Sequence, residues 1–136
     1  QFIFGAFTAG LDAGRGFNTW PLMHGQFLAD AATMINPLWL NLIENGVMIQ
    51  FVHRWLGALL VLSVVAFSFA AIKQGVLLRP VFVLLLVSGF QFLLGVLTLL
   101  YAVPVVLGIL HQAFACLMVL VLVYLIYVSL PDKQNS

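Results

Sequence analysis

The sequence predicts an all-α fold: a polytopic membrane protein with a transmembrane four-helix bundle whose first helix is truncated. Of the 136 residues, 64% are hydrophobic and 7% are charged, whereas a soluble domain has roughly a quarter charged residues. The apolar residues are gathered into runs of about twenty, which is the length that crosses a bilayer as a helix. A net charge of +1 provides no basic field. We therefore expect a lipid bilayer as the surroundings and no nucleic acid partner.

The first element, residues 1–10, is expected to be the end of a transmembrane helix. This apolar run supplies only about half of the roughly twenty residues that a span requires. It lacks the preceding positive charge and the following small-residue cleavage site of a signal peptide, so we expect the chain to be a fragment. Residues 11–44 hold three of the four acidic residues and two of the five prolines. They predict one long extramembrane segment, called the outer loop below.

Three complete spans are predicted after the outer loop, over residues 45–72, 81–101 and 104–130. The polar residues Lys73, Gln74 and Gly75 close the first of these spans. Pro104 can begin the last span, because proline is tolerated in the first turn of a helix. Together with the truncated helix, these spans are enough for a bundle with a ligand site in its middle.

The basic residues predict the orientation of the bundle. Lys73, Arg79 and Lys133 lie at span ends that must share one side of the membrane, whereas Arg15 in the outer loop is offset by acidic residues. Positively charged loops remain on the cytoplasmic side. We therefore expect the short loop and the C-terminus to face the cytoplasm or the mitochondrial matrix.

Two histidines within the spans are the main candidate site, because an ionisable residue in a membrane segment is costly. His53 and His111 lie about eight and seven residues into helices that run in the same direction, so both should be roughly 10 to 12 Å below the outer surface. Imidazoles at equal depth can approach one heme iron from opposite faces. Gly57, Gly108 and Ala115 lie one turn away from the histidines, where a flat macrocycle needs small neighbours.

Arg54 follows His53 directly and is a candidate for a bidentate contact with a heme propionate. An alternative reading is that each histidine only hydrogen-bonds to a neighbouring helix and that the glycines serve helix packing. A zinc or copper site is less favoured, because no third ligand is predicted at that depth. His24, in the outer loop, is expected to be solvated.

Several stretches resemble the heme A synthase family in their order and spacing. They are GAFTAGLDAG (Gly5–Gly14), NTWPLM (Asn18–Met23), Asn36-Pro37 with Trp39, ENGVMIQFVHR (Glu44–Arg54), LGVLTLLYAVP (Leu94–Pro104) and LHQAFA (Leu110–Ala115). The resemblance is to the C-terminal half of the proteobacterial and mitochondrial branch, since the outer loop has no cysteine pair.

The resemblance implies a membrane oxidoreductase made of two similar four-helix halves. Such enzymes oxidise a ring methyl of heme O to the formyl group of heme A, which supplies cytochrome oxidase. The half that is similar to this chain carries a b-type heme between two histidines, and His53 and His111 match them. The N-terminal half takes heme O, so no catalytic residue is expected here. The implied location is the bacterial cytoplasmic membrane or the mitochondrial inner membrane, and a homo-oligomer is compatible with the sequence.

Glu44 precedes His53 by nine residues, about two and a half helical turns. It is a candidate for a proton or propionate contact at the mouth of the heme pocket, or else an acidic residue that favours the helix start. For the whole chain, two alternatives to the oxidoreductase half remain. One is a stand-alone four-helix electron-transfer cytochrome b, and the other is a heme-free membrane scaffold.

Overall fold

The computed structural model describes residues 1–130, which form helices and loops and contain no strand. Three of the helices are long: α3 (Gly46–Lys73), α4 (Leu78–Leu100) and α5 (Val105–Ser129), and each is apolar and long enough to cross a membrane. At a rise of 1.5 Å per residue, even the 23 residues of α4 extend about 35 Å, which exceeds the hydrocarbon thickness of about 30 Å. The predicted class of an all-α polytopic membrane protein is confirmed. The predicted tail beyond residue 130, which includes Lys133, lies outside the described residues.

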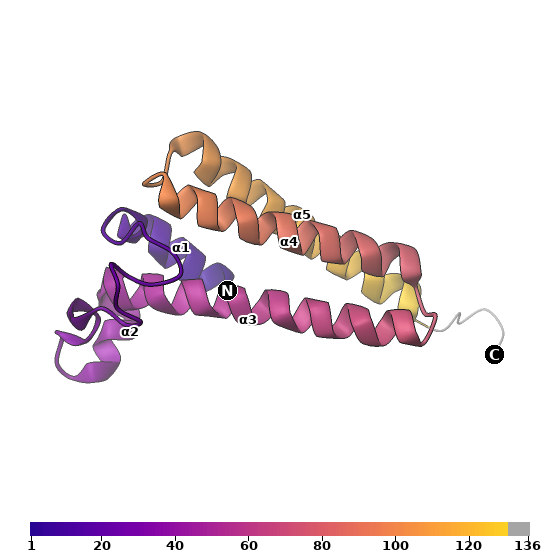
Figure 1. Cartoon of the computed structure of the whole chain (residues 1–136), viewed down its shortest axis with the longest axis horizontal. Helices are drawn as coiled ribbons and strands as arrows, with labels where there is room; N and C mark the ends of the chain where they lie inside the picture. The colour runs from indigo at the N-terminus through magenta and orange to yellow at the C-terminus, as the bar shows by residue number, and fades with distance from the viewer. Residues whose placement is uncertain (131–136) are drawn as a thin grey trace.

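The helices are arranged as two pairs (Figure 1). The short helix α1 (Phe2–Gly10) packs against α3, and α4 packs along α5. The two pairs meet at the short loop after α3 and separate toward the opposite end, which we call the outer end because the outer loop gathers there. Gly75 allows the sharp turn of the short loop, since it has φ +67°.

Apolar packing is concentrated in the inner half of the bundle. A buried cluster joins α3, α4 and α5 there and comprises Val64, Val81, Leu84, Met118 and Leu125. Most other apolar side chains on the long helices point outward and are exposed. In water such a surface would cause aggregation, but in a bilayer it faces lipid. The cluster therefore packs the inner end of the bundle, and the two histidines lie in the outer half.

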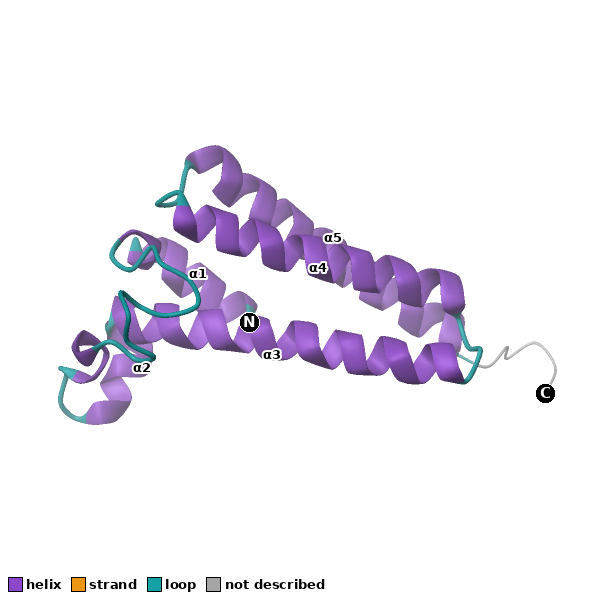
Figure 2. Cartoon of the chain, in the orientation of Figure 1, coloured by secondary structure: helices purple, strands orange, loops and turns teal. Residues whose placement is uncertain are grey.

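The outer loop is folded back on itself rather than extended (Figure 2). It contains the 3-10 turns Ala13–Arg15, Asp30–Thr33 and Leu38–Leu40 and the short helix α2 (Asn41–Glu44). Two buried asparagines organise it. The Asn41 side chain donates to the carbonyl oxygens of Ile35 and Leu38, and the Asn45 side chain donates to the carbonyl oxygen of Ala31 and to the side-chain Oδ1 of Asn41. Buried amides require such partners.

Two helix starts have clear local causes. The Oδ1 atom of Asn45 accepts a hydrogen bond from the backbone N–H of Val47 at 3.0 Å and so caps α3. Helix α4 begins at Leu78, three residues before the predicted start at 81. Pro80 is tolerated there because it falls in the first turn, where a backbone N–H has no intrahelical acceptor.

Candidate functional site

The structure brings the two membrane histidines together. His53 is the eighth residue of α3 and His111 is the seventh residue of α5, counted from the helix starts. Their ring centroids are 6.4 Å apart, and the ring planes are inclined by 88°. The two residues are 58 positions apart in the sequence, with the whole of α4 between them. Equal depth on parallel helices therefore leads to proximity in the folded bundle.

Each histidine ring has a buried nitrogen without a hydrogen-bond partner. Within the described residues, neither Nδ1 of His53 nor Nδ1 of His111 makes a hydrogen bond. A buried polar atom without a partner is uncommon and costs about 1 to 3 kcal/mol. The alternative reading is that each ring only hydrogen-bonds to a neighbouring helix. No such hydrogen bond is made by either Nδ1 atom.

Each ring also rests on a glycine of the helix that is paired with its own helix, which is α1 for His53 and α4 for His111. A methyl group added at Gly5 in α1 would lie 3.1 Å from Cε1 of His53. A methyl group added at Gly95 in α4 would lie 2.8 Å from Cε1 of His111. Neither glycine was predicted from the sequence to be part of the site. A signal was present, because both stand in the pattern Gly-x-x-Thr within an apolar run.

Gly57 and Gly108, which the sequence singled out, do not contact the rings. A methyl group at Gly57 would meet the Nε2 atom of Gln1 at 3.0 Å, so this position faces α1. A methyl group at Gly108 would meet nothing within 4 Å. That the heme macrocycle lies beside these two glycines stays a prediction.

Arg54 is buried and holds the outer loop. Its Nη1 atom donates to the carbonyl oxygen of Thr19 at 2.7 Å, and its Nη2 atom donates to that of Phe17 at 2.8 Å. Longer bonds from Nη1 reach Pro21 and Leu22, at 3.4 and 3.3 Å. Of the three guanidinium nitrogens, Nε is the one that is buried without a hydrogen-bond partner within the described residues. The propionate contact stays a prediction, while the contacts seen here bind the loop to α3.

Further interactions strengthen this attachment of the loop. Gln50 lies one turn before Arg54 and donates through Nε2 to the carbonyl oxygen of Phe17 at 3.1 Å. The guanidinium of Arg54 also lies 5.7 Å from the ring centre of Trp20, within range of a cation–π interaction. The Trp20 ring in turn packs against Trp55 of α3 and Phe92 of α4. The outer loop thus covers the outer end of the helices.

The other polar candidates lie away from the histidine pair. Glu44 is exposed at the end of α2, and no hydrogen bond or ion pair involves its side chain within residues 1–130. His24 is exposed in a turn of the outer loop, where its ring packs on Phe17 at a centroid distance of 4.9 Å. The possible role of Glu44 at a pocket mouth stays a prediction.

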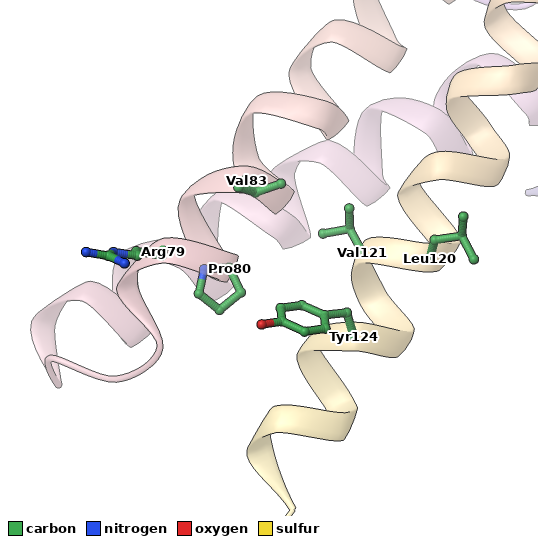
Figure 3. Close-up of a pocket in the computed structure, with 6 residues that line it drawn as sticks. All are labelled: Arg79, Pro80, Val83, Leu120, Val121 and Tyr124. Carbon is green, nitrogen blue, oxygen red and sulfur yellow. The ribbon is translucent and has the colours of Figure 1, made fainter.

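A cavity of about 330 Å³ lies near the inner end, between α4 and α5. Its lining consists of Arg79, Pro80, Val83, Leu120, Val121 and Tyr124 (Figure 3). The Arg79 side chain points away from the other five residues in this view. The cavity contains no histidine, cysteine or carboxylate, so its chemistry differs from that of the histidine pair. No group of three or more such residues is assembled anywhere in the described part of the chain.

A multi-pass helical membrane protein with two facing histidines in its outer half is the class that the fold and site define. A model of the family described as "Cytochrome oxidase assembly protein" matches residues 1–123. The chain belongs to this family.

Several relatives of the chain are heme A synthases, which confirms the resemblance predicted from the sequence. The heme A synthase of Bartonella henselae is 43% identical over 118 residues, which cover 85% of this chain and 33% of the relative. That of Wolbachia pipientis wMel is 42% identical over 115 residues, with coverage of 85% and 32%. That of Beijerinckia indica is 41% identical over 122 residues, with coverage of 86% and 34%. The chain thus spans about a third of the length of these relatives. No solved structure matches it.

Proposed function

We propose that this chain is the heme-binding part of a heme A synthase and that His53 and His111 are the axial ligands of a b-type heme. The observation that carries the proposal is the facing pair of imidazoles, each with a buried nitrogen that lacks a protein partner. The family and the heme A synthase relatives support it. The resemblance to those enzymes identifies heme as the bound group. The contacts of the two histidines test whether heme fits this site.

The separation of the rings suits a shared metal ion. Two metal–nitrogen bonds of about 2 Å, together with about 1 Å from each nitrogen to its ring centre, place the centroids about 6 Å apart. The distance between the His53 and His111 centroids is 6.4 Å. Rings in direct van der Waals contact with perpendicular planes would also be compatible with this value, so the family and the heme A synthase relatives are what favour ligation.

The donor set also fits heme better than zinc. A closed zinc site requires four ligands, and a catalytic zinc site commonly has three from the protein. The described residues provide two histidines here and no cluster of three or more ligating residues. Heme iron needs only two axial donors, because the macrocycle supplies the others. Two histidines on separate helices are therefore a sufficient protein contribution.

Within this proposal, the residues of the chain have distinct tasks. His53 and His111 hold the cofactor, and Arg54 fixes the loop that covers the outer end of α3. When bound between two imidazoles, heme supplies one-electron transfer. Two protein ligands leave no open iron position for a substrate. We therefore assign the oxidation of the heme O methyl group to the part of the relatives that lies beyond this chain, with this half as an electron relay or a structural support.

The location and partners follow from the same resemblance. We propose that the substrate of the whole enzyme is heme O and that the N-terminal half of the same protein is the partner of this bundle. The bacterial cytoplasmic membrane or the mitochondrial inner membrane is the proposed location, with the C-terminus on the cytoplasmic or matrix side. A stand-alone electron-transfer cytochrome b would show the same spectrum but would produce no heme A.

The test is the replacement of each histidine by alanine in the purified full-length protein. His53→Ala and His111→Ala should each abolish or convert the low-spin b-type spectrum, because a six-coordinate iron needs both imidazoles. His24→Ala is the matched control, since this third histidine is exposed in the outer loop. Pigment extraction should also show less heme A in cells that express either membrane variant. Unchanged spectra in both variants would exclude the proposed ligands.

A further inference from the structure

We propose that Gly5 and Gly95 are positioning residues that set the orientation of the two heme ligands, each by forming the surface on which one imidazole rests. The inference rests on the proposed function, because ring orientation matters to the iron only if the histidines bind it. It concerns two glycines that lie 90 positions apart and on different helices.

The contacts single out these two glycines. Methyl groups at Gly5 and Gly95 would lie 3.1 and 2.8 Å from Cε1 of His53 and His111, respectively. The same methyl groups would lie 3.6 and 3.4 Å from the Nδ1 atoms. Among the eleven glycines of the chain, no other has a histidine ring within 4 Å of its added methyl group. Both histidines therefore turn the same ring edge, Cε1 first, toward a glycine.

The local sequence around each glycine repeats. Residues 4–8 are FGAFT and residues 94–98 are LGVLT, so each glycine is followed by a threonine three residues later. The hydroxyl of Thr8 donates to the carbonyl oxygen of Phe4, and the hydroxyl of Thr98 donates to that of Leu94, both at 2.7 Å. Each hydroxyl is thus satisfied within its own helix, which leaves the glycine as the contact with the ring.

The arrangement of helices repeats as well. Helix α1 carries Gly5 and precedes the histidine helix α3, while α4 carries Gly95 and precedes the histidine helix α5. The site is therefore built from two helix pairs of the same design, each with a glycine facing a histidine. A chance packing contact would not be expected at corresponding places in both pairs.

The size of the contact predicts what a methyl group would do. At 2.8 Å, the ring of His111 would have to move by several tenths of an ångström to reach ordinary van der Waals separation. Metal–ligand distances in well-formed sites lie within about 0.2 Å of their usual values. The group that must move is the end of a side chain and not backbone, so the helices can keep their places while the ring turns. At Gly5, where the distance is 3.1 Å, the required movement is smaller.

The experiment compares Gly95→Ala and Gly5→Ala with matched controls in the purified full-length protein. Gly89→Ala is the control in α4 and Gly10→Ala is the control in α1, because an added methyl group meets nothing within 4 Å at either position. The readouts are the g values of the low-spin ferric heme by electron paramagnetic resonance, its midpoint potential, and the ratio of heme B to protein. The g values are informative because they depend on the angle between the two imidazole planes, which is 88° between His53 and His111.

We expect a shift of the largest g value and of the midpoint potential in Gly95→Ala, a smaller shift in Gly5→Ala, and wild-type values in both controls. If Gly95→Ala does not accumulate in the membrane, the milder Gly5→Ala variant decides the question. Wild-type g values and potential in whichever of these variants accumulate would overturn the inference.

The outcome is separable from that of the proposed function. If the wild-type protein contains no heme B with two histidine ligands, the proposed function fails and the inference fails with it. If the wild-type protein holds this heme and loses it in His53→Ala and His111→Ala, but the glycine variants match the wild type, only the inference fails. Equal shifts in the variants and in the Gly10 and Gly89 controls would also reject it, because the effect would then not depend on the ring contact.

Discussion

Replacement of Arg54 by leucine should release the outer loop from α3. The wild-type guanidinium makes two short hydrogen bonds to loop carbonyl oxygens, at 2.7 Å to Thr19 and 2.8 Å to Phe17. A hydrogen bond to a charged group contributes about 1.5 to 3 kcal/mol. We use the lower end of this range for both bonds, because water can solvate the released carbonyls, and obtain about 3 kcal/mol for the attachment of the loop. The longer bonds, at 3.3 and 3.4 Å, are expected to add little.

Hydrogen exchange of two loop amides measures this free energy directly. The backbone N–H of Met23 donates to the carbonyl oxygen of Gln26 at 2.7 Å, and that of His24 donates to Oγ1 of Thr19 at 2.8 Å. Both bonds lie within the loop that Arg54 attaches to α3, so we expect both amides to exchange faster when the loop opens more often. A loss of about 3 kcal/mol should accelerate their exchange roughly 100-fold in Arg54→Leu.

A second arginine of the outer loop provides the control. Arg15 is exposed, and within residues 1–130 its one ion pair joins Nε to Oδ1 of Asp12 at 3.9 Å. Such surface pairs contribute between zero and about 1 kcal/mol, so Arg15→Leu should leave the exchange of Met23 and His24 nearly unchanged. Exchange in Arg54→Leu that stays within about threefold of the wild type would refute the assignment of Arg54 as the anchor of the loop.

Two further predictions concern the space beside the heme and the start of α3. Gly57→Leu and Gly108→Leu should each lower the ratio of heme B to protein more than Gly89→Leu does, if the first two positions line the macrocycle; equal ratios in all three would assign these glycines to another task. Asn45→Ala removes the helix cap and two side-chain hydrogen bonds and should destabilise the protein by about 1 to 3 kcal/mol in thermal unfolding. The exposed Asn36 provides the comparison, and an equal effect of Asn36→Ala would argue against the buried network.

Hydropathy alone was sufficient to predict the membrane class and the long helices. The three apolar runs coincide with α3, α4 and α5, because a bilayer selects helices by the length and polarity of contiguous residues. The chief difference was at the start of α4, which begins at Leu78 and not at the predicted residue 81, with Pro80 inside its first turn. Counting along the helices also placed His53 and His111 at one depth, since the helical rise is constant.

Contacts across the bundle could not be obtained in this way. Arg54 was assigned to a heme propionate from its place beside His53, but the loop residues that it contacts are 32 to 37 positions away. The sequence offered no means of pairing a guanidinium with backbone carbonyls, because every residue of the loop has one. The sequence likewise placed Asn41 in the outer loop and Asn45 at the start of a span, and it offered no means of predicting the hydrogen bond between their side chains.

The sequence by itself determined the class of the protein, the number of long spans and the shared depth of its two membrane histidines. These properties depend on local composition and on the fixed rise of a helix. Only the tertiary structure decided which small residues face the rings. Gly57 and Gly108 are near the histidines along the chain, yet the glycines in contact with the imidazoles are Gly5 and Gly95. A ring that projects from one helix is packed by the neighbouring helix, and the rotation of that neighbour is set by the packing of the whole bundle.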